Sequence, residues 1–147
     1  MHLLAFRFFR RKILLAMTKL ICVLIGGVFG TGCRYGLSLF VQNAFSGQGA
    51  DGKTPFPYAT FLINVTGSFV IGLLAELFSA KVPVSPVLRA TLLTGVLGGY
   101  TTFSSFSLET LSLLRDGKWG SACVNAVGSV LLGLLAVWLG VRVAQML

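Results

Sequence analysis

The sequence predicts an all-α membrane protein with four transmembrane helices, the third of them broken near its middle. Hydrophobic residues make up 55% of the 147 residues and charged residues only 11%, and the mean hydropathy is +0.87. Such values lie outside the range of soluble domains. Because a bilayer core of about 30 Å requires roughly 20 apolar residues per helix, four windows qualify as spans: Leu20 to Val41, Tyr58 to Phe78, Ala90 to Leu114 and Gly120 to Val141.

Residues 1–16 precede the first window and form a basic extension to a single four-helix membrane domain at residues 17–147. The extension contains Arg7, Arg10, Arg11 and Lys12. Two interpretations stay open. Either Met17 is the true start of translation, or the extension is an amphipathic helix at the membrane interface.

The net charge of +8 does not indicate a nucleic-acid partner, because the bases lie at the ends of the spans rather than on one face of a folded domain. With the whole chain counted, eight bases fall on the side of both termini and three on the other, which places the termini in the cytoplasm. A chain starting at Met17 has four against three. That small bias favours insertion in both orientations and an antiparallel dimer.

The first window holds two pairs of glycines spaced four apart, Gly26 with Gly30 and Gly32 with Gly36. This spacing lets another helix approach closely, either within one subunit or between subunits. Arg34 lies in the same window, about 12 Å from its end at 1.5 Å per residue, so its side chain can extend toward the surface. A cation there would attract anions to a vestibule; the alternative is an ion pair with Glu76 or Glu109.

The second window carries Thr60 and Asn64, which share a helix face because they are four residues apart. A buried asparagine offers two N–H donors and one carbonyl acceptor. Asn64 is therefore a candidate for the lining of an ion path, and a hydrogen bond between two helices is the alternative.

The third window contains a glycine pair followed by threonines and serines, from Gly98 to Ser107. Glycine costs a helix interior roughly 1 kcal/mol, and hydroxyls in hydrocarbon indicate a polar surrounding, so we expect a broken helix that lines a pathway. Backbone carbonyls freed around Gly98 and Thr101 can hold a cation. The alternative role of Thr101 and Thr102 is to bond the freed backbone groups with their hydroxyls.

Phe103 and Phe106 follow the break three residues apart, with Ser104 and Ser105 between them. Phenylalanine pairs in apolar helices usually pack in a core, but the positive edge of the ring can face an anion. In the fourth window Asn125 and Ser129 are four apart and are candidates for the same path.

These motifs resemble the Fluc/CrcB family of fluoride channels. The resemblance covers all four windows in order and leaves out only the first sixteen or so residues. Its pieces are GGVFGTGCR from Gly26, TFLINVTGSFVIG from Thr60, TGVLGGYTTFSSFSLE from Thr94 and NAVGS from Asn125.

The resemblance implies an antiparallel, dual-topology homodimer in the bacterial inner membrane that lets fluoride leave the cell passively and lowers fluoride toxicity. It also implies a structural sodium ion, held by the backbone carbonyls of Gly98 and Thr101. Gly133 departs from the family pattern, since relatives often have a hydroxyl there. The implied anion path comprises Asn64, Phe103, Phe106, Ser104, Ser105, Ser129 and Thr60, with Arg34 at the vestibule.

Other classes fit the sequence less well. A small multidrug exporter needs a carboxylate in its first helix, where this chain has Arg34 and no acid. An accessory subunit without transport activity would use the polar face of the third helix only as an interface. An enzyme is not expected, because the sequence has no Ser-His-Asp set, metal-ligand cluster or phosphate loop.

Overall fold

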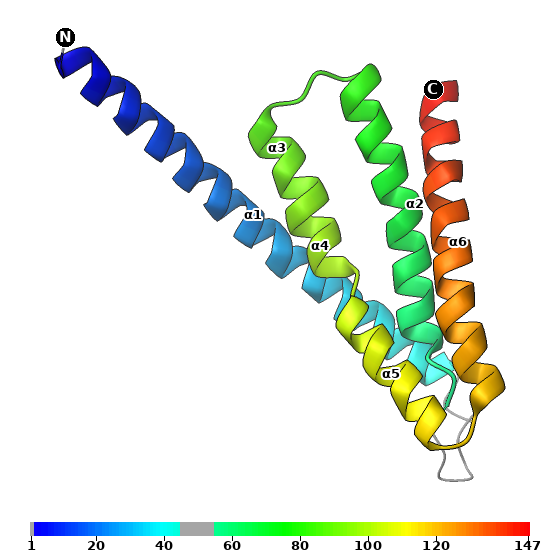
Figure 1. The fold of residues 1–147 in the computed structure, drawn as a ribbon. Coiled ribbons are helices and arrows are strands. Elements are labelled where there is room, and N and C mark those ends of the chain that lie inside the picture. Colours follow the sequence, from blue (N-terminus) through cyan, green and yellow to red (C-terminus); the bar gives the residue numbers. More distant parts are fainter. Residues whose placement is uncertain (1, 45–54) are drawn as a thin grey trace.

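A computed structural model describes residues 2–44 and 55–147, with side chains described from Arg10 onward. Helix α1 (His2–Ala44) crosses the molecule obliquely, while α2 (Tyr58–Ala80) and α6 (Trp119–Met146) stand side by side (Figure 1). Both termini and the connection from α2 to the third helix lie at one end of this bundle (Figure 1). Three helices, α1, α2 and α6, are long and apolar enough to cross a membrane.

The remaining crossing is assembled from short helices, as the sequence predicts. Its first half consists of α3 (Pro86–Ala90), the π-helical turn η1 (Thr91–Val96) and α4 (Leu97–Tyr100), and its second half is α5 (Phe103–Arg115). The Oγ of Ser85 caps the first half by accepting the N–H of Leu88 at 3.1 Å. The described residues therefore form four crossings, with the break in the third.

The position of the break differs from the expectation based on the glycines. Gly98 and Gly99 remain helical, and the chain leaves the helix at Thr101 and Thr102, whose ψ angles are 158° and 115°. Gly99 instead permits close contact with α1, since a Cβ atom there would lie 2.5 Å from the carbonyl oxygen of Gly27. Packing, rather than conformational freedom, explains this glycine.

Close approach of backbones also joins α2 to α6. A Cβ atom on Gly72 would overlap the carbonyl oxygen of Val137, and one on Gly140 would overlap that of Phe69. Neither helix could carry a side chain at these points without moving away from the other. Because no hydrophobic force drives helices together in lipid, such van der Waals contact between backbones is a main source of stability.

The two glycine pairs of α1 have different surroundings. Gly26 and Gly30 face the first half of the third crossing, and a Cβ atom on Gly30 would overlap the carbonyl group of Val96. Gly32 and Gly36 have no atom within 4 Å of the corresponding position. The first pair therefore packs within the subunit, and the second pair faces open space.

This contrast gives a matched test of packing. We expect Gly30→Ala to destabilise the protein by about 1–3 kcal/mol, the usual cost of overfilling a packed contact. Gly120→Ala adds the same methyl group to open space at the start of α6 and should leave stability unchanged or raise it slightly, because alanine favours helix. Thermal unfolding in detergent compares the two variants, and equal unfolding temperatures would contradict the packing assigned to Gly30.

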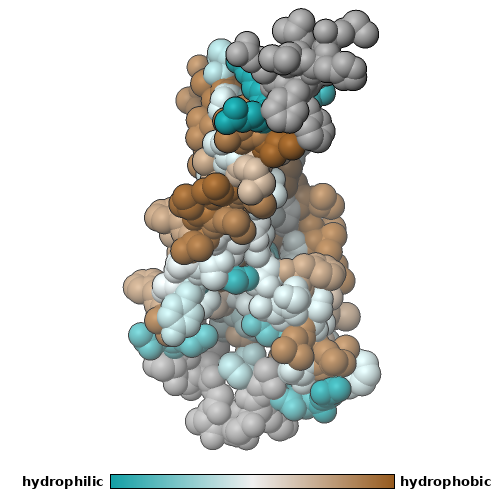
Figure 2. All heavy atoms as spheres, turned by 90° about the vertical axis from the view of Figure 1, so that its left-hand side faces the viewer, coloured by the Kyte–Doolittle hydropathy of each residue, from teal (hydrophilic) through white to brown (hydrophobic). Residues whose placement is uncertain are grey.

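Much of the described surface is apolar, as expected for a chain that contacts lipid. Exposed large hydrophobic residues occur on every long helix, among them Phe29, Leu62 and Leu134, which are 66%, 41% and 66% exposed. Figure 2 shows broad brown areas on the face it presents. The described chain is thus a multi-pass membrane protein whose polar groups require a separate explanation.

Candidate functional site

Asn64 binds the broken segment of the third crossing with both ends of its amide. Its Nδ2 donates to the carbonyl oxygen of Thr102 at 3.1 Å, and its Oδ1 accepts the N–H of Thr102 at 2.9 Å. The side chain therefore imitates a backbone partner for a residue that lies outside the helix. One amide N–H remains for a further acceptor.

The break is also closed by hydroxyl groups, as the alternative interpretation of the threonines expected. Thr101 Oγ1 donates to the carbonyl of Leu97 at 2.9 Å, and Thr102 Oγ1 accepts the N–H of Ser105 at 3.3 Å as the N-cap of α5. Helix caps of this kind satisfy N–H groups that have no partner within the helix. Both threonines thus stabilise the break.

These bonds change the surroundings of two carbonyl groups. In a continuous helix the N–H of Thr102 would bond to the carbonyl of Gly98, but Asn64 accepts it. The N–H of Ser105 would likewise bond to the carbonyl of Thr101, but the Thr102 hydroxyl accepts it. Gly98 is exposed on the surface of the subunit and Thr101 is half-buried. Two carbonyl oxygens therefore lose their helical donors within one turn.

A groove of about 370 Å³ runs beside the break, and we call it the ring groove. It brings together six of the residues predicted from the sequence, drawn from α2, α4, α5, α6 and the break. The rings of Phe103 and Phe106 lie 5.5 Å apart at an angle of 42°. The lining residues with predicted roles are Asn64, Gly98, Thr101, Phe103, Phe106 and Ser129.

Ser129 adds a hydroxyl to the ring groove. Its Oγ is buried and has no hydrogen-bond partner among the described residues. Asn125, one turn earlier, does not line the groove, since it is fully buried and its Nδ2 donates to Thr110 Oγ1 at 2.8 Å. Its amide joins α6 to α5, so the expectation that both residues line one path is wrong for Asn125.

A second cavity of about 230 Å³, the arginine pocket, also borders the break at Thr102. It contains Arg34 from α1, Thr60 from α2, and Ser105 and Glu109 from α5. Thr102 lines both this pocket and the ring groove. The residues predicted for one path are thus divided between two cavities that share Thr102.

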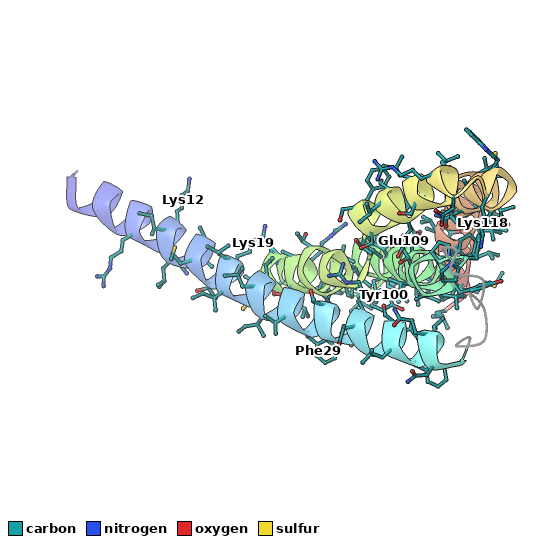
Figure 3. The ribbon with its side chains drawn as sticks, turned by 90° about the horizontal axis from the view of Figure 1, so that it is seen from below. Lys12, Lys19, Phe29, Tyr100, Glu109 and Lys118 are labelled. Carbon is teal, nitrogen blue, oxygen red and sulfur yellow. The ribbon has the colours of Figure 1, made fainter. Side chains whose placement is uncertain are left out.

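Glu109 faces the interior of the bundle (Figure 3). Thr60 donates its hydroxyl to Glu109 Oε1 at 2.8 Å, while Oε2 is buried with no hydrogen-bond partner among the described residues. Glu76, the other candidate partner of Arg34, instead accepts from Gln145 at 3.1 Å. Arg34 therefore shares its pocket with Glu109 and not with Glu76.

Ser104 is exposed on the first turn of α5, and its hydroxyl lies 3.4 Å from that of Thr102. Gly133, where a hydroxyl was expected by resemblance, faces α2 instead of open space. A Cβ atom there would lie 3.5 Å from the Oγ of Ser68, a residue that lines the ring groove. Ser68 thus brings a hydroxyl from α2 close to Gly133.

Sequence reasoning missed Thr102, Ser68 and Glu109 as members of the site. The hydroxyl at Thr102 was noticed, but nothing in the sequence joins it to Asn64, 38 residues away. Ser68 is four residues after Asn64, and this helical spacing was the available signal. The sequence offers Glu109 only as a possible ion-pair partner of Arg34, although a charge inside a span is itself a pointer to function.

Comparison with known proteins gives a consistent result. A family model described as CrcB-like protein, Camphor Resistance (CrcB), matches residues 21–141. A protein of Opitutus terrae named Fluoride-specific ion channel FluC is 47% identical over 126 residues, which cover 84% of this chain and 90% of the relative. Proteins of the same name from Paramagnetospirillum magneticum and Citrifermentans bemidjiense are 48% and 41% identical, covering 80% and 89% of this chain and 88% and 100% of the relatives.

Proposed function

Because the chain belongs to the CrcB family, we propose that it is a fluoride-selective ion channel and not an enzyme. Fluoride would leave the cytoplasm passively, down its electrochemical gradient, which lowers fluoride toxicity. The observation that carries the proposal is the ring groove, where two phenylalanine rings, an asparagine amide and an unpartnered serine hydroxyl meet. Voltage-driven fluoride efflux from liposomes tests it directly.

The chemistry of the groove suits a small, strongly hydrated anion. Removing water from fluoride in a low-dielectric span costs tens of kcal/mol without replacement contacts, so donors must replace water stepwise. The remaining N–H of Asn64, the Ser129 hydroxyl and the positive ring edges are such donors. We expect selectivity over chloride to come from the narrow spacing of these groups.

Arg34 and the hydroxyl groups of its pocket would serve the vestibule of the same path. A guanidinium stays charged in proteins and raises the local concentration of anions. Thr60, Ser104 and Ser105 would continue the polar lining from this side. Glu109, which accepts a hydrogen bond from Thr60, lines the same pocket as Arg34, and its Oε2 has no partner among the described residues.

The functional unit we propose is an antiparallel, dual-topology homodimer in the bacterial inner membrane. A single subunit leaves the glycines Gly32 and Gly36 uncovered, and Phe103 is 79% exposed although it lines the ring groove. A second copy packed along α1 would cover the open glycine face. It would also supply the wall that an exposed ring needs to border a narrow path.

The proposed dual topology depends on the charge at the N-terminal end. The described bases at the end that holds both termini are Arg10, Arg11, Lys12, Lys19, Lys81, Arg89 and Arg142, against Arg115 and Lys118 at the other end. We expect the full chain to insert mainly with its termini in the cytoplasm, and a chain starting at Met17 to insert in both orientations. Reporter enzymes fused to the C-terminus measure this, and one fixed orientation for the shorter chain would contradict dual topology.

We further propose a structural sodium ion bound by the carbonyl oxygens of Gly98 and Thr101 from each subunit. Two features support it: both carbonyls lose their helical donors to Asn64 and Thr102, and Gly98 has open space around it on the exposed face. Carbonyl oxygens are hard ligands suited to such a cation. When bound, sodium would supply positive charge that holds two broken helices together.

Removal of sodium should therefore weaken the assembly. A ligand that binds only the assembled state stabilises it by about 2.7 kcal/mol at 100 times its dissociation constant. We expect sodium-free buffer containing N-methylglucamine to lower the thermal stability of the dimer and the fluoride efflux together, and added sodium to restore both. Equal stability with and without sodium would contradict the proposed ion.

A further inference from the structure

The N-terminal turns of α1 extend beyond the other helices (Figures 1 and 3). We call residues 10–19 the basic segment. Every side chain from Arg10 to Ile21 is exposed, so this part of α1 is not used to hold the bundle together. It also precedes the segment matched by the family model, which begins at residue 21.

The basic segment carries charge of one sign only. Arg10, Arg11, Lys12 and Lys19 lie within it, and the first acidic residue of the chain is Asp51. Lys12 and Lys19 lie on the same side of α1 (Figure 3), as expected for residues seven apart in a helix. Several bases in a stretch of sequence that contains no acidic residue attract an anionic surface.

The same turns carry apolar side chains next to the bases. Ile13, Leu14 and Leu15 are 49%, 68% and 56% exposed, and Met17 is 51% exposed. No helix end separates these residues from the span, since α1 is continuous from His2 to Ala44. At 1.5 Å per residue, Lys12 is only about 12 Å from Leu20, where the apolar window begins.

The oblique course of α1 matters for where these groups lie. Because α1 leans away from α2 and α6 (Figure 1), its N-terminal turns lie apart from those helices. Bases next to exposed apolar side chains match an anionic lipid surface. Nucleic acid would use the bases but would leave the exposed leucines in water.

We propose that the basic segment docks on anionic phospholipid headgroups at the membrane surface next to the N-terminal end of the bundle. The contact fixes the N-terminal half of α1 against one leaflet. The position of this half of α1 therefore depends on the anionic lipid content of that leaflet. This proposal is independent of the conducted ion, and its test does not measure transport.

The test uses an environment-sensitive nitrobenzoxadiazole dye at position 15. Leu15→Cys is made in a Cys22→Ala, Cys33→Ala, Cys123→Ala background, labelled, and reconstituted into vesicles of phosphatidylcholine with or without phosphatidylglycerol. We expect the emission to shift to the blue only in the anionic vesicles, and the shift to disappear at high salt, because screening removes contacts between exposed charges. Equal emission in both kinds of vesicle would overturn the proposal.

A pair of charge variants locates the effect. The first triple variant, Arg10→Gln, Arg11→Gln, Lys12→Gln, should abolish the shift. The second triple variant removes three bases elsewhere, by Arg89→Gln, Arg115→Gln, Arg142→Gln, and should preserve the shift. Retention of the shift in the first variant, or its loss in the second, would contradict docking through the basic segment. A blue shift produced in neutral vesicles by duplex RNA would assign the segment to nucleic acid instead.

Discussion

Replacing Asn64 with leucine is expected to lower fluoride efflux about 100-fold, the equivalent of about 2.7 kcal/mol at 1.36 kcal/mol per factor of ten. The substitution removes two hydrogen bonds to the backbone of Thr102. Each backbone group left without a partner costs about 1–3 kcal/mol. It also removes the amide N–H that faces the ring groove, so the geometry of the break and a donor are lost together. Efflux from liposomes measures the change.

Gln145→Leu is the matched control, because it removes another amide of a membrane helix. Gln145 donates to Glu76 and lies outside both the ring groove and the arginine pocket. Its loss should leave efflux close to that of the unaltered protein. If Asn64→Leu and Gln145→Leu conducted equally well, the role assigned to Asn64 would be wrong.

Replacing Phe103 or Phe106 with isoleucine is expected to lower fluoride efflux about tenfold for each ring, since interactions of a ring edge are worth about 0.5–1.5 kcal/mol. Isoleucine keeps an apolar surface but has no positive edge for an anion. Dimer assembly should change far less than efflux, because isoleucine keeps an apolar surface where Phe103 is 79% exposed in the subunit. Efflux and size-exclusion chromatography measure the two effects separately.

Phe40→Ile provides the comparison for the ring variants. Phe40 is 71% exposed on α1 and lines neither cavity. We expect normal efflux from this variant. Normal efflux from Phe103→Ile and Phe106→Ile as well would contradict contact with the anion and would leave both rings only a role in packing.

The long helices follow from the sequence because hydropathy over some 20 residues reports directly on the bilayer. The predicted windows at Tyr58 to Phe78 and Gly120 to Val141 fall within α2 and α6. The break in the third crossing is also predicted, because a glycine pair followed by hydroxyl groups in an apolar span indicates a polar surrounding and an interrupted helix. Its exact position is not, because Gly98 and Gly99 stay helical and packing against α1 uses Gly99.

Contacts between distant residues were not predictable from spacing. The bond from Asn64 to Thr102 crosses 38 residues, and the bond from Thr60 to Glu109 crosses 49. Helical periodicity places residues on a face but does not say which other helix that face meets. The same reasoning explains Asn125, whose spacing suggested the ion path but whose amide is bound to Thr110.

The division into two cavities is also a property of the folded chain. From the sequence, the polar residues form one set, whereas the structure divides them between the ring groove and the arginine pocket, which share Thr102. An anion crossing the proposed path would therefore pass Thr102, which Asn64 binds. The proposed mechanism therefore depends most on the hydrogen-bonded pair of Asn64 and Thr102.

The decisive measurement is ion efflux from liposomes that contain the purified protein and are voltage-clamped with a potassium ionophore. We predict that fluoride leaves rapidly down the imposed voltage and that chloride, under the same gradient, does not. The lack of voltage-driven fluoride efflux, or efflux of chloride at the same rate, would contradict a fluoride-selective channel.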